Sequence, residues 1–216
     1  LTQADNQEAR SILQKKAVDD IVSRLNNNFE VLSHFEDSIL FNYLQMENKE
    51  MTDYVIDTYY NKLPKEYQDG ALLFRIKSAM KTAIGVNAPD FSWQENGTSK
   101  NLYELIGHDY YIVVFFSSGC PHCKQEIPEF HEFIKEFGNI KIFAIGLEDN
   151  SQKDWEIMVK DYTEFTNILD LKKWDSQKAK DYGVTAIPSY FLLDKNKVIV
   201  AKPNDVEELK EMFQPR

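Results

Sequence analysis

Hydrophobic residues in the first part of the chain recur every three or four positions, the spacing of one face of an α-helix. The clearest series comprises Phe29, Leu32, Phe35, Ile39, Tyr43 and Met46. Similar series follow from Tyr54 to Leu63 and from Leu72 to Ile84. Gly70 and Pro64 are the only glycine and proline before Gly85, so few turns interrupt this stretch. The pattern predicts an all-α helical domain at residues 1–84, with three or four helices.

The hydrophobic period changes from Gly85 onward. Tyr110–Phe116 is an unbroken run of aromatic and β-branched residues, typical of a central strand that is buried on both faces. Shorter runs at residues 140–145, 190–193 and 197–201 predict further strands. The last two flank the polar turn Asp194-Lys195-Asn196, and we expect them to form an antiparallel hairpin.

Segments with helical spacing separate these predicted strands. They lie at residues 120–137, 152–162 and 176–182, and a last helix is predicted from Val206 to Phe213. Strands that alternate with helices are typical of a sheet packed between helices. The pattern therefore predicts an α/β sandwich with a mixed sheet at residues 85–216.

The composition is that of a soluble globular protein. Hydrophobic residues make up 43% and charged residues 28% of the 216 residues. The longest apolar run is far shorter than the ~20 residues of a membrane-spanning helix, so we expect no such segment here. The formal net charge of −10 opposes binding to nucleic acid. No basic and apolar leader follows Leu1, and we expect any export signal to lie outside this chain.

The two cysteines lie in the sequence Cys120-Pro121-His122-Cys123, between a predicted strand and a predicted helix. A sulfur at the start of a helix faces unpaired backbone N–H groups, which stabilise the thiolate over the thiol. Pro121 falls in the first turn, where its missing N–H is not needed. The spacing places Cys123 on the same helix face, close enough to bridge Cys120. We predict a redox pair in which Cys120 is the nucleophile and Cys123 resolves the mixed disulfide.

Two further residues of this helix are candidates for the chemistry. An imidazolium or donating N–H at His122 would stabilise the Cys120 thiolate and shift the pair toward being an oxidant. Glu126 shares the helix face of Cys123, and a carboxylate in that apolar setting could accept the proton of the second thiol. The alternative for both is an exposed helix residue without a catalytic role.

Other interpretations of the cysteines carry less weight. A zinc site needs about four ligands, no second pair of cysteines exists, and His122 and His131 would complete a site only with awkward geometry. Two inert buried cysteines fit poorly with the strand–turn–helix setting. We therefore expect neither a metal nor an organic cofactor. His34, His108 and His131 have no partner pattern and are predicted to be surface or cap residues.

Three separate motifs occur along residues 85–216, in the order in which a known superfamily has them. They are Ala88-Pro89-Asp90-Phe91, the strand and helix from Val113 to Pro128 with the two cysteines, and the segment from Tyr182 to Ser189. Together they resemble the thioredoxin-like superfamily, specifically its TlpA/ResA-type thiol-disulfide oxidoreductases. The resemblance implies a thioredoxin-like α/β/α sandwich with a mixed sheet at residues 85–216, preceded by the all-α helical domain.

The resemblance also implies roles for individual residues. Cys120 and Cys123 match the nucleophilic and resolving thiols, and Glu126 matches an acidic residue beneath the active site. Pro188 matches the family's cis-proline, and proline is the residue that adopts a cis bond at least cost. Ile187 would offer backbone hydrogen bonds to an extended substrate, so substrate contacts are assigned to Pro121, Ile187 and Pro188.

The sequence departs from the family pattern at several positions. Val114 stands where thioredoxin has a buried aspartate, and Gly119 replaces the usual tryptophan. The dipeptide between the cysteines is the one found in the oxidising DsbA proteins, so the direction of electron flow stays open. The positions of the proline and threonine of peroxiredoxins are Val113 and Ser117, and peroxide reduction is not expected.

The sequence thus predicts a thiol-disulfide oxidoreductase that exchanges electrons with protein thiols or disulfides and with a redox partner protein. The resemblance implies an extracytoplasmic location in a bacterium, in the periplasm or cell envelope. The alternative is a redox-sensing or partner-binding module whose thioredoxin-like half is a scaffold without efficient turnover. The helical half could select substrates, form a dimer or cover Cys120, and the sequence does not distinguish these roles.

Overall fold

The structure, a computed structural model, describes residues 3–25, 28–149 and 152–213. The chain divides into two compact units, Leu1–Ala83 and Ile84–Arg216, and each unit is described by itself. Within the described residues, no helix combines the length and the apolar character that crossing a membrane requires.

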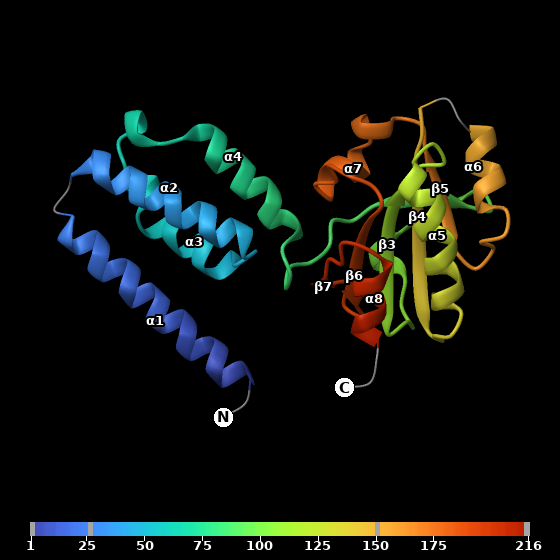
Figure 1. Cartoon of the computed structure of the whole chain (residues 1–216), viewed down its shortest axis with the longest axis horizontal. Helices are drawn as coiled ribbons and strands as arrows, with labels where there is room; N and C mark the ends of the chain where they lie inside the picture. Colours follow the sequence, from blue (N-terminus) through green and yellow to red (C-terminus); the bar gives the residue numbers. More distant parts are fainter. Residues whose placement is uncertain (1–2, 26–27, 150–151, 214–216) are drawn as a thin grey trace. The chain divides into compact units, whose positions relative to one another are not determined.

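The first unit is helical, as the hydrophobic spacing predicts. Its helices are α1 (Gln3–Arg24), α2 (Phe29–Gln45), α3 (Lys49–Thr58) and α4 (Gly70–Ala79) (Figure 1). Polar side chains cap the first turns of α3 and α4: Asn48 accepts the Met51 N–H at 3.1 Å, and Asp69 accepts two backbone N–H groups at 2.8 and 3.0 Å. Pro64 lies between the two short 3₁₀ turns that separate α3 from α4.

The buried face of α2 differs from the predicted one. Leu32, Leu40 and Tyr43 are buried together with Glu36, whereas Phe29 and Met46 are 40% and 64% exposed. The residues from Leu32 through Glu36 and Leu40 to Tyr43 are spaced by three or four, so they already form a continuous stripe. The predicted stripe is therefore wrong at its two ends, and its centre is occupied by an acidic residue.

The second unit contains a five-stranded mixed sheet, which confirms that prediction. Its strands are β3 (Tyr110–Phe116), β4 (Ile140–Leu147), β5 (Thr166–Asp170), β6 (Ser189–Asp194) and β7 (Ile199–Ala201), in the order β5-β4-β3-β6-β7. β4 is parallel to both β3 and β5, whereas β6 is antiparallel to β3 and β7. Sequence patterns missed β5 and a separate hairpin formed by β1 (Ser92–Glu95) and β2 (Thr98–Asn101).

Central strand β3 is buried on both faces, as predicted. The helices of this unit are α5 (Pro121–Ile134), α6 (Gln152–Val159), α7 (Gln177–Asp181) and α8 (Val206–Phe213) (Figure 1). Ile112, Val114 and Phe116 belong to a hydrophobic cluster with residues of α5 and α8. Tyr111, Val113 and Phe115 belong to a second cluster with residues of β1 and α7. The sheet is therefore packed between two layers.

The pairing of β3 with β4 positions the loops that follow them. Phe116, the last residue of β3, is paired with Gly146, next to the end of β4. The two strands run parallel, so their carboxyl ends meet at one edge of the sheet. The turn that carries Cys120 therefore lies beside the residues that follow Leu147.

Candidate active site

Cys120 lies at the amino end of α5 and caps it. Its backbone is extended, with φ −83° and ψ 121°, and its Sγ accepts the Cys123 N–H at 3.3 Å. The Cys120 N–H donates to the Ser117 carbonyl at 3.1 Å, which closes the turn between β3 and α5. The Cys120 sulfur thus faces the unpaired N–H groups at the start of the helix, and Pro121 is exposed in the first turn.

Cys123 is the inner thiol of the pair. Its side chain is completely buried, whereas Cys120 is half-buried, and both thiols are free. Burial raises the pKa of the Cys123 thiol, and its hydrogen bond with the Cys120 side chain raises this pKa further. An accessible thiol beside a protonated buried one is the arrangement that thiol–disulfide exchange through a mixed disulfide requires.

The segment that precedes β6 lies against the reactive sulfur. The Cys120 thiol donates to the Ile187 carbonyl at 3.7 Å, and the peptide bond between Ile187 and Pro188 is cis. Ile187 and Pro188 are both half-buried, so part of each remains open to a bound chain. The structure thus places the Ile187 carbonyl and the cis peptide bond that follows it beside Cys120.

Glu126 lies on the same face of α5, one turn beyond Cys123. Burial raises the pKa of its carboxyl, while the Tyr190 hydroxyl, which donates to Oε2 at 3.3 Å, lowers it. Asp205 also raises this pKa; the Val206 N–H and His122 lower it. The charge of Glu126 in turn raises the pKa of Cys123, so the carboxyl and the buried thiol influence each other electrostatically.

Tyr190 is a residue of this site that the sequence analysis missed. It lies on β6, is 2% exposed, and packs edge to face on Phe130 of α5 with ring centroids 5.6 Å apart. Burial raises the pKa of Tyr190, and the charges of Glu126 and Cys123 add to this effect. A tyrosine two positions after the predicted cis-proline was the available signal, since alternate residues of β6 face α5.

The structure places His122 and His131 in different surroundings. His122 is exposed on the first turn of α5, and its Coulombic interaction with Glu126 lowers the pKa of that carboxyl. His131 is predicted to be a surface or cap residue, and this prediction is wrong. It is 5% exposed, its Nε2 lies 2.5 Å from Glu164 Oε1, and its ring packs on Tyr162. The loop after α6 covers the last turn of α5, so the imidazole of His131 is buried there together with a hydrogen-bond partner.

Glu148 is a second residue that the sequence analysis missed. It directly follows β4 and is 2% exposed. Its carboxylate accepts the Ser117 hydroxyl at 3.1 Å and the Ser118 N–H at 2.5 Å. A charged residue directly after a buried strand, beside the strand that carries the cysteines, was the available signal.

A hollow of about 300 Å³ lies beside Cys120. It is lined by residues of the turn before α5, of the end of β4 and the loop after it, of the turn after β5 and of the segment before β6: Ser117, Gly119, Cys120, Leu147, Glu148, Asp149, Lys173, Trp174 and Ile187. Trp174 is 44% exposed. The hollow therefore offers apolar and polar surface next to the reactive sulfur.

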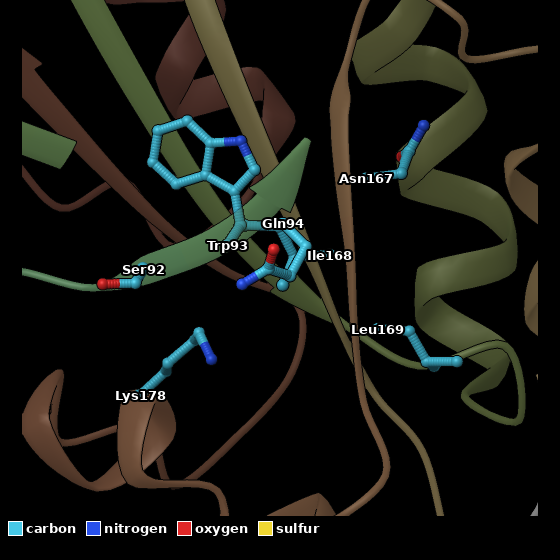
Figure 2. A pocket seen from close by; sticks show the side chains of 7 residues that line it. All are labelled: Ser92, Trp93, Gln94, Asn167, Ile168, Leu169 and Lys178. Carbon is cyan, nitrogen blue, oxygen red and sulfur yellow. The ribbon is translucent and has the colours of Figure 1, made fainter. Parts of the chain in front are cut away.

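A second hollow of about 310 Å³ lies away from the cysteines. Figure 2 shows its lining: Ser92, Trp93 and Gln94 from β1, Asn167, Ile168 and Leu169 from β5, and Lys178 from α7. It shares no lining residue with the hollow beside Cys120.

Among the residues that the structure describes, no three or more His, Cys, Asp and Glu side chains converge as a metal site would require.

A known protein family matches most of the second unit. The family model described as the AhpC/TSA family matches residues 84–202, more than half of the chain. The chain belongs to the AhpC/TSA family. This match includes β3, the two cysteines, Glu126, Glu148 and the cis-proline segment, so the whole candidate site lies within the family's domain.

Two relatives are similar to this chain over different lengths. Sporulation thiol-disulfide oxidoreductase A of Bacillus subtilis (strain 168) is 32% identical over 108 residues, which are 46% of this chain and 64% of that protein. Thiol-disulfide oxidoreductase ResA of Geobacillus thermodenitrificans (strain NG80-2) is 25% identical over 150 residues, 67% of this chain and 83% of that protein. The match thus spans less than two thirds of the sporulation protein.

One solved structure is similar over both units. A thioredoxin-like protein from Bacteroides caccae ATCC 43185 matches with a TM-score of 0.62 and 23% identity, covering 93% of this chain and 76% of that one. This likeness shows that the fold is thioredoxin-like, in agreement with the predicted fold class.

Proposed function

We propose that the chain is a thiol-disulfide oxidoreductase that exchanges electrons with protein thiols and disulfides through Cys120 and Cys123. The single observation that carries this proposal is the arrangement of the two sulfurs. The accessible Cys120 Sγ accepts the Cys123 N–H at the start of α5, and the free thiol of Cys123 is buried behind it. The similarity to two proteins named thiol-disulfide oxidoreductases supports it.

We assign the activity to a domain of residues 85–216 and treat residues 1–84 as a separate helical domain.

The proposed reaction balances without a cofactor. In the reducing direction, the Cys120 thiolate attacks one sulfur of a substrate disulfide; that S–S bond breaks, a substrate thiolate leaves, and a mixed disulfide forms. The Cys123 thiolate then attacks the Cys120 sulfur, the second substrate thiolate leaves, and a bond forms between Cys120 and Cys123. Two electrons pass to the substrate, and the protons lost by the two cysteines balance those that the substrate thiolates take up.

The second step needs a proton acceptor for Cys123. Its buried thiol has a raised pKa, so it is protonated when the mixed disulfide forms. Glu126 is half-buried beside it and interacts with it electrostatically, and we assign Glu126 as the acceptor. The Tyr190 hydroxyl orients the Glu126 carboxylate through their 3.3 Å hydrogen bond. Each turnover then ends when a partner protein with a dithiol reduces the pair; in the opposite direction, the same steps oxidise a substrate dithiol.

The substrate would bind between the segment before β6 and the hollow beside Cys120. The Ile187 carbonyl lies 3.7 Å from the Cys120 sulfur, within reach of an extended chain that carries the attacked cysteine. The hollow has room for a side chain next to that cysteine, with Trp174 as an exposed apolar wall. The resemblance to TlpA/ResA-type proteins favours a place in the periplasm or cell envelope, where protein disulfides persist.

An insulin-reduction assay with dithiothreitol as the electron source tests the proposed function. We expect the wild-type chain to accelerate reduction and the Cys120→Ser variant to lose the acceleration completely. Incubated with insulin in the absence of dithiothreitol, the Cys123→Ser variant is expected to form a mixed disulfide with the substrate that stays trapped, visible on a non-reducing gel. Absence of turnover by the wild-type chain would favour the alternative, a binding or sensing module.

A further inference from the structure

Glu148 is a buried carboxylate that the exchange reaction does not itself use. Removal of a carboxylate from water is costly unless its oxygens accept hydrogen bonds. Both oxygens of Glu148 do so: Oε2 accepts the Ser117 hydroxyl at 3.1 Å, and Oε1 accepts the Ser118 N–H at 2.5 Å. Both of these donors are neutral, and both belong to the turn that joins β3 to α5.

The hydrogen bonds continue from this turn to the reactive cysteine. Ser117 Oγ, which donates to Glu148, also accepts the Gly119 N–H at 3.2 Å. The Ser117 carbonyl accepts the Cys120 N–H at 3.1 Å. A connected series of bonds therefore runs from the Glu148 carboxylate through Ser117 to the backbone of Cys120.

The backbone of Glu148 is held by the sheet. Its N–H donates to the Asp170 carbonyl at the end of β5 at 2.9 Å, and its carbonyl accepts the Lys173 N–H at 3.2 Å. β4 itself is paired with β3 as far as Phe116 and Gly146. The carboxylate thus projects from the joined ends of three strands, and a group on such a support holds its partners more firmly than one on a free loop.

We propose that Glu148 is a positioning residue for Cys120, whose carboxylate holds the turn from Ser117 to Gly119 and thereby keeps the Cys120 sulfur at the start of α5. The inference rests on the proposed thiol–disulfide exchange for its meaning. Ser117, Gly119, Cys120 and Glu148 all line the hollow beside the sulfur, so a displaced turn would move the nucleophile relative to a bound substrate.

The test compares Glu148→Ala, which removes both acceptors, with Glu148→Gln, which keeps the shape of the side chain. The amide can accept the Ser118 N–H and donate to Ser117 Oγ, so the turn should stay in place. Glu156→Gln, an exposed change on α6, is the matched control. The first readout is the rate at which iodoacetamide alkylates Cys120 at neutral pH, in a Cys123→Ser background. The second is kcat/KM for insulin reduction with Cys123 intact.

We expect Glu148→Ala to slow alkylation and to lower kcat/KM by about 10-fold or more, since small misplacements of a reacting group are costly. For Glu148→Gln, both rates should stay within about threefold of wild type. The amide keeps both hydrogen bonds, and each is only somewhat weaker than the charge-assisted bond that it replaces. Glu156→Gln should change neither readout. An unchanged alkylation rate in Glu148→Ala would overturn the proposal. A Glu148→Gln variant as slow as Glu148→Ala would also overturn it, because the charge would then matter rather than the position.

Two further outcomes are separated by design. If circular dichroism shows that Glu148→Ala does not fold, Ser117→Ala decides instead. It removes the hydroxyl that donates to Glu148 and accepts the Gly119 N–H, and it leaves the bond from the Ser118 N–H in place. A wild-type alkylation rate in that variant contradicts the proposed link from Glu148 through Ser117 to Cys120. If the wild-type chain fails to reduce insulin, the proposed function fails. The alkylation rates still decide whether Glu148 positions Cys120, because they need no substrate protein.

Discussion

Glu36 should make the stability of the helical unit depend on pH. It lies on the buried stripe of α2, is 0% exposed, and neither of its carboxylate oxygens has a hydrogen-bond partner. Burial raises the pKa of Glu36 from 4.5 to about 7, and the neighbouring charge of Asp37 contributes to the rise. The folded chain therefore binds a proton that the unfolded chain releases at a much lower pH.

The size of the effect follows from this difference in pKa. Each pH unit of difference corresponds to about 1.4 kcal/mol, so the rise of the Glu36 pKa from 4.5 to about 7 amounts to about 3.5 kcal/mol. This stability is fully present below the unfolded pKa of 4.5 and is lost as the pH rises through the folded pKa of about 7. We expect the free energy of unfolding to fall by about 2.5 kcal/mol between about pH 5 and about pH 8 because of Glu36 alone.

Urea titrations at these two pH values, followed by far-ultraviolet circular dichroism, would measure the effect. The Glu36→Gln variant removes the titrating group and should lose most of the difference between the two pH values, whereas the exposed Glu66→Gln variant should keep it. All three tryptophans lie in the second unit, so their fluorescence reports that unit separately. The reasoning is refuted if Glu36→Gln retains the full pH dependence of the wild-type chain.

Two predictions concern the active site. Tyr190→Phe keeps the ring contact with Phe130 but removes the hydroxyl that lowers the pKa of Glu126. The acid limb of the pH profile for insulin reduction should therefore move to higher pH, and an unmoved limb would show that Glu126 is not the proton acceptor. His122 is predicted to favour the dithiol, so redox titration should give a midpoint above about −270 mV, the value for thioredoxin. His122→Ala should lower this midpoint, and an equal value in both chains would remove His122 from the mechanism.

The fold could be predicted from the sequence where burial produces a strong local pattern. β3 is buried at every position after Tyr110, so its side chains had to be apolar. β5 was missed because only Ile168 within it is buried; an edge strand can carry polar residues on most of its positions. Glu36 was absent from the predicted stripe for a similar reason, since hydrophobic spacing treats every acidic residue as exposed.

The candidate site was predictable where its residues are close in the sequence. Cys120, Cys123 and Glu126 lie on one helix face, so their spacing alone brings them together. Tyr190 reaches Glu126 across 64 positions, and Glu148 reaches Ser118 across 30. These contacts depend on which strands are neighbours and in which register, and no local pattern of hydrophobic residues contains that information.

The sulfur that caps α5 is also the proposed nucleophile. In the dithiol form, Cys120 Sγ accepts a backbone N–H of the helix's first turn. Once that sulfur is bonded to Cys123 it carries no charge and is a poorer acceptor, so oxidation weakens the helix end. The reduction potential of the cysteine pair and the stability of the first turn of α5 are then coupled. A substitution that stabilises this turn without the sulfur cap should favour the disulfide, and one that makes the turn depend more on the cap should favour the dithiol.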